Sequence, residues 1–229
     1  MADLITKPES TGRRERRKRA TRAKLLQAAS EVMGRVGVDA ATIKEITDTA
    51  DVGFGTFYTY FETKDALAAA LLDCMINDIA RRNEIATAEL QRIRSREVPA
   101  VRTRLLLRTA MTDPFWRWWA ERPMLLFERL NMGIGPFAKA DLLKDIRGGV
   151  SGLAEDELES SWRLAVWTMV GGIHDVVHGE QPFANEVFVT EAVMRLLGTD
   201  AANARTLSTT SLPPLPDADI DWNFVLGVG

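Results

Sequence analysis

The stretch from residue 51 to 67, DVGFGTFYTYFETKDAL, holds both tyrosines of the 229-residue chain. Hydroxyl and ammonium groups crowd this stretch, and such groups donate hydrogen bonds to phosphate oxygens. Backbone amides at a helix start can do the same. The donors expected here are the helix start at Thr42 and the side chains of Thr56, Tyr58, Tyr60 and Lys64.

Two short helices must position these donors. Thr42, with Glu45 three residues later, has the pattern of a capping box and predicts a helix start. A second helix is expected from 54 to 61, where Phe57 and Phe61 share one face and can pack on the preceding helix. The opposite face is then displayed, as in a helix-turn-helix. The alternative is an ordinary helical hairpin whose aromatic residues form a core.

The basic residues of the chain gather near its start. From Arg13 to Lys24 there are eight basic residues and one acidic residue. Positions 1–64 carry 12 basic and 9 acidic residues, and the remainder carries 17 and 23. A basic head on an acidic body is expected when one end meets a polyanion. A flexible arm over residues 1–20 is therefore expected to bind DNA rather than to be a solvated tail, through Arg16, Arg17 and Arg19.

Composition narrows the class of protein. With 46% hydrophobic and 27% charged residues the chain is typical of globular proteins. The single cysteine, Cys74, excludes an internal disulfide framework and fits a reducing cytoplasm; its place on an apolar helical stripe predicts a packed thiol rather than a redox-active one. No run approaches the roughly 20 apolar residues of a membrane helix, and the N-terminus lacks the apolar middle of a secretory signal. A cytoplasmic protein without a membrane partner is expected.

Apolar residues recur at helical spacing, and no segment alternates with period two, so an all-α fold is expected. A helix from about Thr21 should end at Gly37, and a long helix should start near Lys64. Further helices are expected over 98–111, from Pro114, over 156–178 and over 185–197, while Pro123 and the stretches NMGIGPF and RGGVSG separate further segments.

Residues 22–72 closely resemble the DNA-binding domain of the tetracycline-repressor-like (TetR) transcriptional regulators. The resemblance lies in a first helix that ends in Gly, a Thr cap, a second helix, a turn, and then the pattern G-T-x-Y-x-Y/H-F-x-x-K-[DE]-x-L from Gly55 to Leu67. It implies phosphate contacts from the donors named above. It also implies base-edge contacts from Phe54, Gly55 and Thr59, with Lys44 near the DNA backbone. Since the displayed face lacks Asn, Gln and Arg, direct readout should be modest and shape readout more important.

The resemblance further implies an all-helical second domain for effector binding and dimerisation. The expected domains are a basic flexible arm (1–20), a helix-turn-helix domain (21–66), the effector-binding and dimerisation domain (67–198) and an irregular tail (199–229). The function expected is a repressor that binds double-stranded operator DNA as a homodimer and leaves a pseudo-palindromic operator when a hydrophobic or aromatic small molecule binds. The alternative is a ligand-independent DNA-binding dimer controlled by a protein partner or by concentration alone.

Five of the six tryptophans fall in the second domain. Aromatic and methionine linings suit a pocket for a bulky apolar or aromatic molecule, although each such side chain could equally be plain core. Arg108, Arg117 and Arg129 could pair a ligand carboxylate or make surface salt bridges. The lining expected is Met111, Phe115, Trp116, Trp119, Phe127, Trp162, Trp167 and Met169.

The helix over 156–178 is apolar on two sides, and Gly171-Gly172 inside it allows another helix to approach closely. With the following helix it is expected to form half of a four-helix dimer interface. The alternative is a central helix of a monomer. The expected interface residues are Trp162, Val166, Gly171, His174, His178, Phe188, Ala192 and Leu196.

Enzyme motifs are missing from the sequence. It holds no nucleophile elbow, Gly-rich phosphate loop or metal-ligand cluster, so no catalytic residue and no cofactor are expected. His174 and His178 lie four apart beside Asp175, a spacing that can bind a metal, but no third ligand is visible and no metal site is expected. The tail should be irregular, with partial docking of Trp222, Phe224, Val225 and Leu226 because their exposure is costly.

Overall fold

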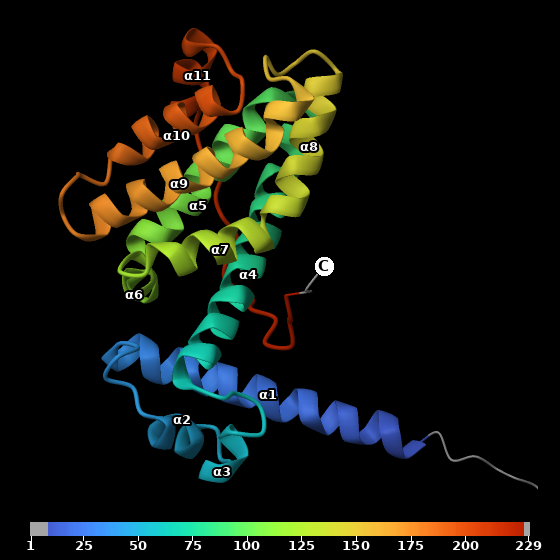
Figure 1. Ribbon diagram of the computed structural model, residues 1–229, viewed down its shortest axis with the longest axis vertical. Coiled ribbons are helices and arrows are strands. Elements are labelled where there is room, and N and C mark those ends of the chain that lie inside the picture. Colours follow the sequence, from blue (N-terminus) through green and yellow to red (C-terminus); the bar gives the residue numbers. More distant parts are fainter. Residues whose placement is uncertain (1–8, 227–229) are drawn as a thin grey trace, which may run out of the picture. The chain divides into compact units, whose positions relative to one another are not determined.

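The computed structural model describes residues 9–226. The chain forms two compact units, each described by itself below (Figure 1). The described part of the first unit comprises residues 9–74 and 221–226, and the second unit comprises residues 75–220. Within residues 9–226 every regular element is helical, which confirms the all-α prediction.

The first unit is built from α1 (Glu9–Val36), α2 (Ile43–Thr49), α3 (Phe54–Phe57) and the beginning of α4 (Lys64–Ile93). Its core contains the apolar stripe of α1 together with Ile46, Phe57 and Leu67. Gly37 takes a φ of +84°, which glycine adopts without steric cost, and its amide donates to the carbonyl of Met33. The predicted end of the first helix at Gly37 is therefore confirmed.

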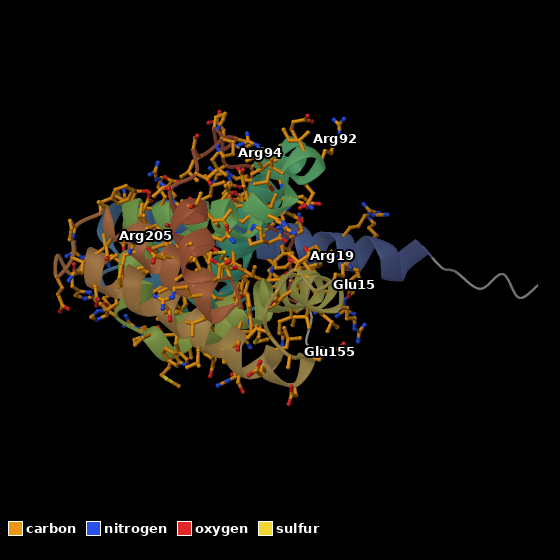
Figure 2. The ribbon with its side chains drawn as sticks, turned by 90° about the horizontal axis from the view of Figure 1, so that it is seen from above. Glu15, Arg19, Arg92, Arg94, Glu155 and Arg205 are labelled. Carbon is orange, nitrogen blue, oxygen red and sulfur yellow. The ribbon has the colours of Figure 1, made fainter. Side chains whose placement is uncertain are left out.

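The basic stretch is helical, which corrects the expectation of a flexible arm. α1 begins at Glu9, so residues 9–20 belong to the helix, while residues 1–8 lie outside the described part. Long unbranched Arg and Lys side chains favour a helix, and residues 13–36 contain no proline. Residues 12–20 are exposed; Glu15 and Arg19 are labelled on this part of α1 in Figure 2.

The third helix is shorter than the sequence predicts. An α-helix was expected over 54–61, but α3 ends at Phe57 and a turn follows. The amides of Thr59 and Tyr60 donate to carbonyls three residues back, at 3.1 and 2.9 Å, so the last turn is tightened into a 3₁₀-like form. Phe57 and Phe61 remain buried, so the shortening leaves the predicted inward face intact.

The second unit contains the rest of α4 and a set of helices that contact α9 (Figure 1). The predicted start at Pro114 is confirmed, and the break expected at Pro123 is the start of a helix, since proline suits the first turn of a helix. The elements are η1 (Ser95–Glu97), α5 (Val98–Thr112), α6 (Pro114–Ala120), α7 (Pro123–Gly133), α8 (Gly135–Arg147), η2 (Glu155–Glu157), α9 (Leu158–Val177), α10 (Asn185–Leu196) and α11 (Ala201–Ser208).

Helix α9 packs on α5, α6, α7, α8 and α10. The close approach expected at Gly171-Gly172 is made at Gly172, where a Cβ atom would lie 2.5 Å from Val189 of α10. Any side chain at this position would push the two helices apart. Gly171 is exposed, and a Cβ there would meet nothing within 4 Å.

The C-terminal region is only partly irregular, which corrects the prediction for residues 199–229. Asp200 caps α11 by accepting from the amides of Ala202 and Asn203, a helix start that the sequence analysis overlooked. In the second unit, Arg104 and Arg82 donate to the carbonyls of Thr210 and Pro216.

The end of the described tail docks within the first unit. The carbonyl of Phe224 accepts from Arg22 at 3.1 Å and faces the Cys74 sulfur at 3.8 Å. Trp222 and Phe224 are half-buried and Val225 is 64% exposed. Docking therefore relies on a backbone carbonyl as much as on the apolar side chains.

Candidate functional site

The segment after α2 displays two aromatic rings. Phe57 and Phe61 are buried, whereas Phe54 and Tyr58 are each 53% exposed. The Tyr58 ring stands edge-on to Phe54 and Phe57, with centroid distances of 5.8 and 5.3 Å. Buried Phe57 thus supports a ring that itself stays in solvent. Exposure of two large rings does not stabilise the fold, so this face is a candidate binding surface.

The other predicted contacts in this segment lie around the two rings. Gly55 and Thr59 are exposed, and Thr56 and Tyr60 are half-buried. The structure therefore exposes Phe54, Gly55 and Thr59, the expected base-edge contacts, together with Tyr58, an expected phosphate contact. Their placement supports the predicted contacts but does not test them.

The helix start at Thr42 already carries an anionic partner. The Thr42 hydroxyl accepts from the Glu45 amide and donates to the Glu45 carboxylate at 2.7 Å, and the Thr42 amide donates to the same carboxylate. Hydrogen bonds from Thr42 lower the pKa of Glu45. The capping box predicted from the sequence is confirmed. A phosphate at Thr42 would have to compete with this carboxylate, a consequence that sequence reasoning missed.

Both lysines of the predicted interface have partners inside the protein. Lys64 donates to the backbone carbonyls of Asp39 and Ala41, at 2.8 and 2.9 Å. Lys44 donates to the Asp48 carboxylate at 2.6 Å; this hydrogen bond raises the pKa of Lys44, and both side chains are largely exposed. Lys64 therefore holds the loop before α2 through two hydrogen bonds, and its ammonium group has one further N–H that could donate to a phosphate.

The buried thiol of Cys74 fits the expectation of a packed residue. Burial raises the pKa of Cys74 to about 11, so the side chain is a neutral thiol at physiological pH.

Most of the side chains predicted to line a pocket are buried. Phe115, Trp116, Trp119, Phe127, Trp162 and Met169 are buried, and Met111 and Trp167 are half-buried. The rings of Phe127 and Trp167 stack at 4.4 Å, and the Trp162 indole donates to Asn131 at 2.8 Å. The indole nitrogens of Trp116 and Trp119 meet no acceptor among the described residues. We call these eight residues the aromatic cluster.

The dimer prediction is partly wrong, because two of the α9 residues it placed in the interface lie on the buried side of that helix. Trp162 and Val166 are buried within the unit, so they are not available to a partner. The sequence shows two apolar sides and does not say which one faces the neighbouring helices. The structure leaves Leu164 55% exposed and Phe188 69% exposed. Gly171 and His178 are also exposed, and His174, Ala192 and Leu196 are half-buried.

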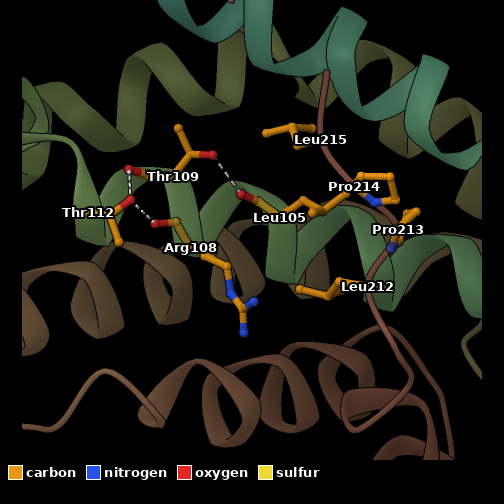
Figure 3. A pocket seen from close by; sticks show the side chains of 8 residues that line it. All are labelled: Leu105, Arg108, Thr109, Thr112, Leu212, Pro213, Pro214 and Leu215. Carbon is orange, nitrogen blue, oxygen red and sulfur yellow. Dashed lines mark hydrogen bonds between the residues drawn. The ribbon is translucent and has the colours of Figure 1, made fainter. Parts of the chain in front are cut away.

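A groove that sequence reasoning did not outline lies between α5 and residues 212–215 (Figure 3). Its volume is about 490 Å³, and none of the aromatic cluster lines it. Behind it, the buried carboxylate of Glu186 accepts from Arg104 and Arg108. Desolvation acts to raise the Glu186 pKa, but hydrogen bonds from the two arginines outweigh it and the pKa is lowered. The lining residues are Leu105, Arg108, Thr109, Thr112, Leu212, Pro213, Pro214 and Leu215.

The structure brings one of the two histidines close to two carboxylates. One ligand atom each from His174, Asp175 and Glu180 lie within 4.8 Å of one another, whereas His178, the other half of the predicted pair, is not part of this group. The His178 Nδ1 faces the His174 carbonyl at 2.8 Å. Exposed acidic groups often gather in this way without an ion, so the arrangement alone does not define a metal site.

Among the helices of the described residues, none has the length and apolar character that a membrane span requires.

Comparisons with known proteins address the first unit most directly. The family model described as "Bacterial regulatory proteins, tetR family" matches residues 25–71. An uncharacterized HTH-type transcriptional regulator of Bacillus subtilis (strain 168), YvdT, is 43% identical over 53 residues. That match covers 23% of this chain and 27% of YvdT, so the chain aligns with about a quarter of that relative.

Two solved structures extend the similarity over most of the chain. RolR in complex with the ligand resorcinol is 26% identical, with a TM-score of 0.77, and the match covers 90% of this chain and 100% of RolR. RolR without ligand is 25% identical, with a TM-score of 0.75, and covers 85% of this chain and 100% of its own. The similarity to RolR therefore extends into the second unit, in fold and at low sequence identity.

Proposed function

Because the chain belongs to the tetR family of DNA-binding transcriptional regulators, we propose that it is a homodimeric repressor. It binds a pseudo-palindromic operator and leaves it when a small molecule binds the second unit. Regulators of this family are usually not enzymes.

The observation that carries the proposal is the exposed pair Phe54 and Tyr58, supported from below by buried Phe57. Phe54 can meet a thymine methyl group, and the Tyr58 hydroxyl can donate to a phosphate. Gly55 leaves room for close approach to base edges. Exposed α1 places Arg16, Arg17 and Arg19 on a helix, so they are proposed to bind phosphates along the DNA backbone rather than to thread into a minor groove.

The dimer is proposed to form through α9 and α10. Leu164, Gly171 and Phe188 are exposed there, together with half-buried Ala192 and Leu196. Two helices from each protomer would bury this apolar face in a four-helix interface. An isologous dimer presents two reading segments, and half-sites on one face of DNA lie about 34–36 Å apart. The operator should therefore be an inverted repeat.

The effector is proposed to bind the aromatic cluster. RolR has been solved with resorcinol, a hydroxylated aromatic ring. Leaving a buried donor unsatisfied costs about 1–3 kcal/mol, so an oxygen-bearing aromatic molecule that accepts from Trp116 or Trp119 would recover that cost. Helix α4 contributes residues to both units, so a change within the second unit can reach the first through one continuous helix.

Selection of bound duplexes from a random DNA pool, at two salt concentrations, tests the proposal. An inverted repeat recovered at both concentrations is expected. Recovery of no motif, with binding that vanishes as salt rises, would leave only the electrostatic attraction of the basic helix and contradict sequence-specific repression.

A ligand-independent regulator is the second candidate. It is favoured because Trp116 and Trp119 are only 1% and 0% exposed, as expected for side chains of a plain core without a ligand. Titration of the operator complex with resorcinol and other small hydroxylated aromatics separates the two candidates. DNA affinity that falls with saturating ligand supports the effector; affinity unmoved by every ligand that binds supports the alternative.

A further inference from the structure

The groove between α5 and residues 212–215 combines charge, hydroxyl oxygens and apolar walls (Figure 3). Its volume of about 490 Å³ falls within the range of roughly 300–1,000 Å³ found for small-molecule sites. The residues from α5 are Leu105, Arg108, Thr109 and Thr112, whose spacing places them on one face of the helix. The groove belongs wholly to the second unit.

The charge in the groove comes from Arg108. Two guanidinium groups share the single carboxylate of Glu186, which leaves one net positive charge. The Arg108 side chain is 44% exposed, whereas those of Arg104 and Glu186 are 10% and 2% exposed. Arg108 donates to Glu186 through Nε and Nη2, and its guanidinium also lies 5.5 Å from the centre of the Phe183 ring. The excess charge is therefore presented where a small anion can reach it.

The hydroxyl groups in the groove are set to accept. The Thr109 hydroxyl donates to the carbonyl of Leu105 at 2.9 Å, and the Thr112 hydroxyl donates to that of Arg108 at 2.8 Å (Figure 3). Each proton is thus used on the backbone, and the lone pairs remain. Such oxygens favour a ligand that carries hydroxyl protons of its own.

The remaining lining is apolar and held in place. Leu105, Leu212 and Leu215 line the groove with the two prolines of the C-terminal segment. Pro213-Pro214 restricts the backbone and offers no amide that a ligand would have to satisfy. Arg104 and Arg82 hold the carbonyls of Thr210 and Pro216, on either side of this segment, at 2.6 and 2.7 Å. The wall is therefore fixed at both ends before any ligand arrives.

We propose that this groove is a second small-molecule site, separate from the aromatic cluster, and that it takes a hydroxylated aromatic carboxylate. The carboxylate binds Arg108, a ring hydroxyl donates to Thr109 or Thr112, and the ring packs on the leucines and prolines. A neutral phenol lacks the partner for Arg108, and a simple benzoate lacks the donors for the threonines. The site does not depend on DNA binding by the first unit.

Titration calorimetry on the full chain with three related compounds tests this assignment. The probes are β-resorcylate, which is resorcinol carrying one carboxylate, resorcinol itself, and benzoate. β-Resorcylate is expected to bind one per chain and to bind more tightly than the other two. Arg108→Met should weaken β-resorcylate binding by about tenfold or more, because it removes a charge-assisted hydrogen bond. Its effect on resorcinol should be small.

Two further variants make the result decisive. Arg147→Met makes the same change at an exposed, glutamate-paired arginine of α8 outside the groove and should leave all three affinities unchanged. The double variant Thr109→Val/Thr112→Val removes both accepting hydroxyls and should abolish the preference for β-resorcylate over benzoate. This test stands even if circular dichroism shows that Arg108→Met is misfolded. Absence of saturable β-resorcylate binding overturns the proposal. So does equal weakening by Arg147→Met, or affinity unchanged in both groove variants, which would place the ligand elsewhere.

Discussion

The chain has two aromatic segments, and the structure treats them in opposite ways. Of the five rings in residues 54–61, Phe57 and Phe61 are buried, Tyr60 is half-buried, and Phe54 and Tyr58 are each 53% exposed. In α6, Trp116 and Trp119 are 1% and 0% exposed and belong to the core of the second unit. Stability accounts for the buried rings of both segments, but it does not account for Phe54 and Tyr58. Exposure therefore makes the first segment a candidate binding surface, whereas burial in the second segment is equally compatible with core and with a ligand site.

Replacing one ring from each segment should give the largest contrast. Trp119→Ala is expected to destabilise the second unit by about 3–5 kcal/mol, because it leaves a cavity in a packed core. Phe54→Ala should change the free energy of unfolding by less than about 0.5 kcal/mol, as exposed substitutions usually do, and should weaken DNA binding instead. Urea denaturation and DNA titration of both variants measure the two effects. Equal destabilisation by the two variants would remove the distinction between the segments.

The buried carboxylate behind the groove should dominate the acid stability of the second unit. Glu186→Gln is expected to cost about 3 kcal/mol at pH 7, since it leaves Arg104 buried with a weaker partner. The lowered pKa of Glu186 means that its contribution is present above the unfolded pKa of about 4.3 and is lost as pH falls through the lower folded value.

Denaturation curves of the wild type and Glu186→Gln should therefore converge at acid pH. Glu159→Gln is the matched control, because Glu159 pairs with Lys139 on the surface and such pairs contribute at most about 1 kcal/mol. A Glu186→Gln deficit that is independent of pH would contradict the role of the carboxylate charge.

Glycine 55 offers a change that should move stability and DNA binding in opposite directions. A Cβ atom there would meet nothing within 4 Å, and the residue lies inside α3. Gly55→Ala should therefore stabilise the fold by about 0.4–1 kcal/mol. If base edges approach this position, the added methyl group should still weaken DNA binding. Thermal unfolding and DNA titration on one preparation give both values, and unchanged or tighter binding would separate Gly55 from the interface.

Local signals in the sequence carried most of the successful predictions. Gly37, the Thr42 and Glu45 capping box, and the prolines at 114 and 123 each set a helix boundary through the chemistry of one or two residues. The early end of α3 depends on a tightened last turn, which residue types alone do not specify. The charge of the basic stretch suggests an exposed arm, but its Arg and Lys side chains also favour a helix, and the helix forms.

Predictions that required tertiary placement were less successful. Helix α9 is apolar on two sides, and only packing on its neighbours shows that Trp162 and Val166 face inward while Leu164 faces out. Lys64 has the right type for a phosphate contact, but its orientation toward two carbonyls arises from residues more than twenty positions away. Sequence periodicity does not indicate that Glu186 is a buried acid. Its burial is explained by the hydrogen bonds that its carboxylate accepts from Arg104 and Arg108.

The central claim is that the exposed face of residues 54–60 reads DNA sequence. Random-pool selection with the wild type, Thr59→Ala and Tyr58→Phe tests it most directly, because both substitutions lie at exposed positions. Thr59→Ala should alter base preference at one position in each half-site, while Tyr58→Phe should weaken all sequences alike by removing a phosphate donor. A motif identical to that of the wild type in Thr59→Ala would contradict the assignment of this face.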